Sequence, residues 1–192
     1  MIKNVYGVGF ALYGATMLIF FGMYFFGMNT EYFSNSLLIN AFLLPVVFVA
    51  GAYFSVYSVK KKGIPMGFQE VFGRTFKPMF VGGILSVITM FLFLNFVDTD
   101  AKDLLNYQYI ERQKTELNNE YEKAKIGMKD VEQKKELEKN YQNRLQSFSP
   151  EMIKGKDMFS FRQFTYYFGA IMAFYVILSV FFASFFRSSI EN

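Results

Sequence analysis

Most of the side chains that enzymes use for nucleophilic or metal chemistry are missing from this chain. Its 192 residues include no His and no Cys, which removes the material for Ser-His and Cys-His nucleophiles and for the common zinc sites. Carboxylates remain, and Asp98, Asp100 and Asp103 could form an acidic site at the end of an apolar run. Charges in such a place are more often simply solvated. We therefore expect no catalytic residue, no metal site and no cofactor.

A second group of chemically capable residues is basic. Residues 60–77 hold one acidic residue, Glu70, against five cations: Lys60, Lys61, Lys62, Arg74 and Lys77. Cations beside apolar runs attract anionic lipid headgroups, at about 1 kcal/mol each. The net charge of +4 therefore indicates membrane lipids as partners and no nucleic acid, and the five cations are the candidate lipid headgroup site.

The elements that position these residues are apolar helices. Hydrophobic residues make up 53% of the chain, with 26 Phe, and uncharged runs cover residues 5–28, 37–59, 78–97 and 164–186. About 20 apolar residues suffice to cross a hydrocarbon core roughly 30 Å thick. The sequence therefore predicts an all-α membrane protein with four transmembrane helices. Pro45 should kink the second helix and free a carbonyl near Ala41 that Asn40 could compensate.

Orientation follows from the short connections. Cytoplasmic connections are enriched in Lys and Arg, and residues 60–77 are strongly basic whereas residues 29–36 carry only Glu31. This places residues 60–77, Lys3, Arg187 and both termini on the cytoplasmic side of the membrane. The apolar side chains at Phe68, Val71, Phe72 and Phe76 recur at helical spacing, which predicts a short amphipathic helix lying in the headgroup layer.

Residues 98–163 differ in composition from the rest of the chain. They hold 26 of the 36 charged residues, 13 acidic and 13 basic, and the topology places them outside the cytoplasm. An apolar stripe runs through this insert but changes phase after Gly127. Two antiparallel helices, over residues 100–126 and 129–147, explain the change and return the chain to the membrane. One long helix is the alternative. A short helix should follow from Pro150 to near Gly155.

Two kinds of residue are candidates for protein contacts. In the insert, four tyrosines could anchor a partner or fill the seam of the hairpin: Tyr107, Tyr109, Tyr121 and Tyr141. In the spans, small residues allow close helix approach and amides give interhelical hydrogen bonds. The candidate packing residues are Gly7, Ala11, Ala15, Asn40, Asn95, Gly169 and Ala173, with the pair Gly82 and Gly83 in the third span.

The order of these features resembles a family of four-pass bacterial membrane proteins, common in Bacteroidota, catalogued as domain of unknown function 4199. The residues that carry the resemblance are the basic turn at 58–63, the segment 64–77 that leads into the third span, and the Glu- and Lys-rich insert before the fourth. The resemblance covers nearly the whole chain. It implies four spans in a bacterial inner membrane, which would put residues 98–163 in the periplasm, and it brings no activity, cofactor or catalytic residue.

We expect the protein to have three parts. Residues 1–97 contain three spans and the basic loop, residues 98–163 form the hairpin, and residues 164–192 contain the fourth span with its tail. The first functional hypothesis is a non-enzymatic accessory or scaffold subunit of an inner-membrane complex, bound to another membrane protein or to its own copies. The alternative is a lipid-handling protein, or one associated with a polyprenyl-phosphate glycosyltransferase. An enzyme that uses the insert carboxylates is the third.

Overall fold

The computed structural model describes residues 4–128, 130–153 and 156–188, and the described residues contain helices but no strand. Four helical segments are long and apolar enough to span a membrane: Val5–Gly27, Tyr32–Lys60, Phe68–Val97 and Phe161–Phe186. The prediction of four such spans is confirmed. Three residues of the sequence interpretation, Lys3, Lys129 and Gly155, lie outside the described part of the chain.

The spans are built from α-helices and two short π-helical turns. The first is α1 (Val5–Gly27), which Asn4 caps by accepting a hydrogen bond from the Tyr6 amide (3.0 Å). The second comprises α2 (Tyr32–Leu38), η1 (Ile39–Leu43) and α3 (Leu44–Lys60). The third comprises α4 (Phe68–Leu92) and η2 (Phe93–Val97), and the fourth is α8 (Phe161–Phe186).

The bundle is organised around α4, which packs against α1, α3 and α8. Glycine brings α1 and α4 together: a Cβ atom on Gly82 would lie 2.8 Å from Leu12 Cβ and 2.9 Å from the Gly9 carbonyl oxygen. Such close approach suits helices in lipid, where dispersion contacts rather than the hydrophobic effect hold the bundle together. The buried core contains Leu12, Phe48, Ala52, Val56, Met79, Tyr175, Phe182 and Ala183.

The prediction of a separate interfacial helix over residues 68–77 is wrong, because this segment is the first part of α4. Most of its apolar stripe faces protein: Val71 is fully buried and Phe72 and Phe76 pack against the core, whereas Phe68 is exposed. The helix continues through Pro78, which cannot donate to the carbonyl four residues earlier. Ser55 of α3 supplies the missing bond, since its Oγ donates to the Arg74 carbonyl oxygen over 2.7 Å. A side chain of the neighbouring helix thus makes the uninterrupted helix possible.

Pro45 coincides with a local change of helix type, and the expected role of Asn40 is the part of the prediction that is wrong. It lies at the start of α3, directly after the π-helical turn η1, in which the Leu44 amide donates to the Ile39 carbonyl. This wider turn is the adjustment that accommodates Pro45. Asn40 does not serve the Ala41 carbonyl; its amide donates to the Ser36 carbonyl over 2.8 Å.

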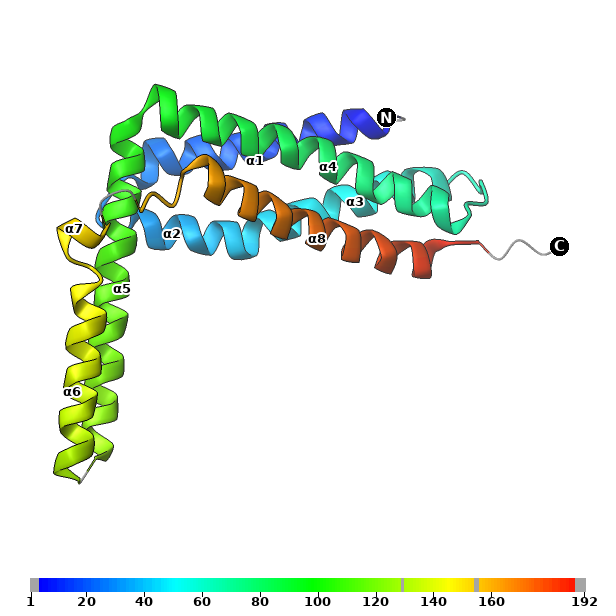
Figure 1. Ribbon diagram of the computed structural model, residues 1–192. Helices are drawn as coiled ribbons and strands as arrows, with labels where there is room; N and C mark the ends of the chain where they lie inside the picture. The colour runs from blue at the N-terminus through cyan, green and yellow to red at the C-terminus, as the bar shows by residue number, and fades with distance from the viewer. Residues whose placement is uncertain (1–3, 129, 154–155, 189–192) are drawn as a thin grey trace.

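The insert forms an arm, defined here as α5 (Thr99–Gly127) and α6 (Val131–Gln146). The two helices are antiparallel and in contact, and the arm leaves one end of the bundle and runs across it, so that bundle and arm resemble the two limbs of an L (Figure 1). The short helix α7 (Pro150–Ile153) follows. The start of α1, the end of α8 and the loop between α3 and α4 lie at the bundle end away from the arm (Figure 1).

Candidate functional site

The base of the arm is held by polar side chains that join α5 to the segment before α8. Lys102 Nζ lies 3.4 Å from Asp157 Oδ2 and 3.4 Å from Asn95 Oδ1. Asn106 Nδ2 donates to Asp157 Oδ1 over 2.9 Å, and Asn106 Oδ1 accepts from the Met158 amide over 3.1 Å. We call Asn95, Lys102, Asn106 and Asp157 the base network.

The ion pair in this network is shielded from water. The side chains of Lys102 and Asp157 are 17% and 29% exposed. Burial alone would raise the pKa of Asp157, but hydrogen bonds from Asn106 and the Phe159 amide, together with the Lys102 charge, outweigh it and lower the pKa. Asp157 is therefore ionised at neutral pH and paired with a lysine, which gives the arm a fixed attachment.

Asn95 extends the network into the third span. Its Nδ2 donates to the Phe91 carbonyl of its own helix and to the Phe159 carbonyl before α8, both over 3.0 Å. Of the two asparagines expected to bond between helices, Asn95 thus joins separate segments, whereas Asn40 bonds within its own helical segment and its side chain is exposed.

The other side of the arm base is bonded to the first two spans. Gln108 Oε1 accepts from the Phe33 amide over 2.7 Å, and its Nε2 donates to the Asn29 carbonyl over 2.8 Å. The Tyr24 hydroxyl donates to Asp98 Oδ2 over 2.6 Å. This bond and the one from the Ala101 amide lower the pKa of Asp98, which begins α5 as its N-cap.

Apolar side chains fill the space beneath these bonds. The arm contributes Ala101 and Leu105, both buried, which pack with buried residues of the second and third spans and with partly buried residues of the first. These apolar side chains exclude part of the water around the hydrogen bonds. The bonds therefore hold the base of α5 to the bundle more firmly than they would in water. The buried residues of this cluster are Tyr32, Phe33, Leu94, Ala101 and Leu105.

The carboxylates considered for catalysis do not form a metal site. Asp98 is engaged as the N-cap of α5, and Asp100 and Asp103 are exposed on that helix. Within residues 4–128, 130–153 and 156–188, there is no group of three or more acidic side chains placed to hold a metal ion.

The opposite end of the bundle carries the five basic residues. Lys60, Lys61, Lys62 and Lys77 are exposed, and the Lys60 ammonium lies 4.9 Å from the centre of the Phe186 ring. Arg74 Nε lies 3.4 Å from Glu70 Oε1. We call these five residues the basic rim.

Comparison with known proteins places the chain in a family. The model of the family described as "Protein of unknown function (DUF4199)" matches residues 6–188. The chain belongs to the DUF4199 family. The family match covers all four spans and the arm of this DUF4199 protein, so it concerns the whole fold rather than one segment. A search of curated proteins and a search of solved structures gave no match.

The four tyrosines of the DUF4199 arm lie in three different settings. Tyr121 and Tyr141 stack in the seam between α5 and α6, with ring centres 4.3 Å apart. Tyr109 packs edge-to-face on Phe33 at the arm base (5.5 Å). Tyr107 is 63% exposed. Two of the proposed docking residues thus hold the arm together, and Tyr107 is the one that a partner could reach most easily.

The small residues predicted as packing positions lie mostly away from the DUF4199 bundle core. Ala11, Gly169 and Ala173 are exposed, and Gly7 and Ala15 are partly buried. The close contact uses Gly9 with Gly82, and a Cβ on Gly83 would lie 2.6 Å from the Tyr175 hydroxyl. Within the bundle, α1 therefore packs through Gly9, and a packing role of Ala11, Gly169 and Ala173 against another subunit stays a prediction.

The sequence interpretation missed the base network. Little in the sequence indicates this network, because Lys102, Asn106 and Asp157 resemble the many other polar residues of the insert. The bond from Ser55 was also missed, although Pro78 inside a helical segment requires another donor for the carbonyl it leaves free.

Proposed function

We propose that this protein is a non-enzymatic accessory subunit of an inner-membrane complex, and that it holds a partner with the arm. The observation that carries the proposal is the attachment of the arm: bonds on both sides of its base fix it across the end of the bundle. A solvated loop needs no such attachment. A fixed arm is suited to positioning something beside the bundle.

The direction of the arm narrows the class of partner. With the four spans across a bilayer, an arm that crosses the end of the bundle lies along the membrane surface. α5 has 29 residues, or about 43 Å of helix, so its outer part extends past the bundle. The partner is therefore a neighbouring membrane protein, or a second copy of the chain, rather than a soluble protein far from the membrane.

The proposed orientation follows from the basic rim. Its cations lie at the end of the bundle away from the arm (Figure 1), so the positive-inside tendency puts the rim in the cytoplasm and the arm outside it. In this orientation the rim faces anionic lipid headgroups, and both ends of the described chain are cytoplasmic.

Single cysteines test the orientation, since the chain has none of its own. A membrane-impermeant maleimide, applied to intact spheroplasts, should label Lys135→Cys on the arm and leave Lys61→Cys unlabelled until the membrane is opened. Labelling of both positions, or of Lys61→Cys alone, in intact spheroplasts would contradict the proposed topology.

Shortening the arm tests its role. Glu120 and Arg144 face each other across the two helices, with Oε2 and Nη1 3.1 Å apart, so residues 121–143 can be replaced by a short Gly-Ser turn while the base network is kept. We expect the shortened protein to insert normally but to lose a photocrosslink formed from Tyr107 to a membrane protein. The matched control is the full-length protein with the same crosslinker at Tyr107. An equal crosslink from both proteins would exclude the outer arm from partner binding.

A second candidate function, lipid handling beside a polyprenyl-phosphate glycosyltransferase, is favoured by a small hollow at the basic rim. It has a volume of about 200 Å³ and is lined by Val5, Gln69, Glu70, Gly73, Arg74 and Lys77. Its lining carries two cations against one carboxylate, Glu70, which pairs with Arg74, so Lys77 is the cation left to meet a lipid phosphate. Its test is binding of a short polyprenyl phosphate to purified protein, which Lys77→Gln should weaken and Lys134→Gln, on the arm, should not.

A further inference from the structure

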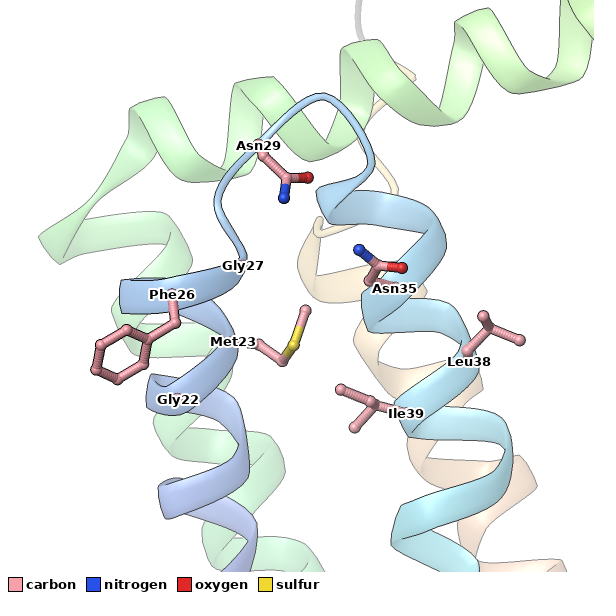
Figure 2. A pocket seen from close by; sticks show the side chains of 8 residues that line it. All are labelled: Gly22, Met23, Phe26, Gly27, Asn29, Asn35, Leu38 and Ile39. Carbon is pink, nitrogen blue, oxygen red and sulfur yellow. The ribbon is translucent and has the colours of Figure 1, made fainter.

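A larger hollow lies at the arm end of the bundle, between α1 and the start of the second span. The last turns of α1 and the α2 and η1 segments stand apart there (Figure 2). The hollow has a volume of about 400 Å³, which is within the range of small-molecule sites. It is lined by Gly22, Met23, Phe26, Gly27, Asn29, Asn35, Leu38 and Ile39.

The walls of the hollow are apolar and open toward lipid. Both walls belong to helical segments that are long and apolar enough to span a membrane. Phe26 and Leu38, on its two edges, are 91% and 57% exposed, so the opening faces the surroundings of the bundle. Gly22 leaves room in the α1 wall, since a Cβ atom there would meet no other atom within 4 Å.

One end of the hollow is polar. The side-chain amides of Asn29 and Asn35 are directed into it (Figure 2). Asn29 Oδ1 accepts from the Glu31 amide, and the Asn29 carbonyl accepts from Gln108 of the arm base. Among the residues that the structure describes, neither Asn29 Nδ2 nor Asn35 Nδ2 donates a hydrogen bond to the protein, so both amides can donate to a ligand at this end, next to the edge of the apolar layer.

We propose that this hollow binds one acyl chain of a membrane phospholipid, with the ester oxygens of that lipid accepting hydrogen bonds from Asn29 and Asn35. A phospholipid ester offers acceptors and no donors, which complements two amide N–H donors. The apolar walls below match the hydrocarbon chain. This site is at the opposite end of the bundle from the basic rim, and the proposal does not depend on the accessory function.

The size of the hollow favours a lipid chain over a protein segment. One turn of a helix, about 10 Å wide and 5.4 Å long, already occupies roughly 400 Å³. Stable protein interfaces bury about 1,000 Å² or more, which a single turn cannot supply. An acyl chain is narrower and is present in the bilayer at high concentration, so it is the occupant that fits.

A single tryptophan can report this lipid, because the chain contains no Trp. Leu38→Trp places the reporter on the edge of the hollow, and Phe25→Trp places it on α1 at an exposed position (70%) that does not line the hollow. Each purified full-length variant is delipidated in detergent and titrated with a phospholipid brominated on its acyl chains, which quenches nearby tryptophan.

We expect Leu38→Trp to be quenched, with saturation, at a mole fraction of lipid about tenfold lower than Phe25→Trp requires, as for a site about 1.4 kcal/mol better than random contact. Adding Gly22→Leu should fill the hollow and remove this difference. Adding Gly14→Leu is the matched control, because Gly14 is also in α1 and a Cβ there also meets nothing within 4 Å. It should leave the difference intact.

A separate variant tests the polar end of the hollow. Asn35→Leu should raise the lipid concentration for half-quenching of the Leu38→Trp reporter about fivefold, the effect of one lost hydrogen bond. Identical quenching curves at the two reporters, or Gly22→Leu and Gly14→Leu acting alike in variants with normal helical circular dichroism, would overturn the proposal.

Discussion

The two ends of the bundle meet water in different ways. At the arm end, Lys102, Asp157 and Asn106 bond to one another in a partly buried network. At the basic rim, Lys61 and Lys62 are exposed and have no carboxylate within 4.0 Å among the described residues. Directional bonds between fixed partners define a geometry, whereas exposed cations attract any anionic surface. The arm end is therefore suited to positioning, and the rim to a fluid headgroup layer.

The largest difference between the two ends should appear when the ion pair at the arm base is broken. Asp157→Ala leaves the shielded Lys102 without its counter-ion and Asn106 without an acceptor, which should cost about 2 to 3 kcal/mol. We expect earlier thermal unfolding in detergent and faster amide exchange in the first turns of α5.

The matched control for this variant lies further along the arm. Glu120→Ala breaks an ion pair with Arg144 whose side chains are 64% and 63% exposed, so its effect on stability should stay below about 0.5 kcal/mol. If Glu120→Ala and Asp157→Ala cost the same, the base network does not have the special role given to it here.

The second difference is in the response to pH. The pKa of Asp157 is lowered in the folded protein, so the stability that this group contributes is complete above its unfolded pKa, about 3.9. That contribution is lost as the pH falls through the lower folded pKa. We expect acid to loosen the arm base.

The contribution of Asp157 must be isolated by comparing two proteins, because Asp98 and Glu138 also have lowered pKa values and contribute to stability in the same acidic range. Unfolding of the wild type and of Asp157→Asn should be followed from pH 6 down to pH 3. The two stability curves should converge as the pH falls. Parallel curves across this range would show that Asp157 ionisation does not stabilise the fold.

Some of these regions could be predicted from the sequence and others could not, for a physical reason. The four spans were predictable because a run of about 20 apolar residues has few alternatives to crossing a membrane. The face of α1 that contacts α4 was not predictable. Ala11 and Gly9 are both small residues of the same run, and only the position of the neighbouring helix determines which of them makes the close contact. The interfacial helix was misjudged because an apolar stripe such as Val71 and Phe72 suits lipid and protein equally well.

The candidate site was predicted less well than the fold. The basic rim could be found as a local cluster of charge in the sequence. The base network could not, because it joins Asn95, Lys102 and Asp157, which are up to 62 residues apart, and each is unremarkable by itself. The network forms only when the packing of Ala101 and Leu105 brings the arm base onto the bundle.

A smaller effect should come from the hydrogen bond that supports α4 near the basic rim. Ser55→Ala leaves the Arg74 carbonyl, which Pro78 cannot serve, without its donor, and should cost about 1 kcal/mol. Ser58→Ala is the control, since Ser58 donates within its own helix to the Ser55 carbonyl and its loss should have little effect. Thermal unfolding of the two variants in detergent measures the difference, and equal midpoints would contradict the role given to Ser55.

The smallest effect on the fold should come from the basic rim itself. Lys61→Gln removes an exposed cation, so the unfolding temperature should not change. Its binding of a short-chain phosphatidylglycerol should weaken about fivefold, the value of roughly 1 kcal/mol per cation near an anionic surface. The loss should shrink in high salt, because exposed charges are screened. Lys134→Gln removes an exposed cation from the arm and should bind this lipid like the wild type. A rim variant that lost stability and kept its lipid binding would reverse the contrast between the two ends, since the rim cations would then be structural.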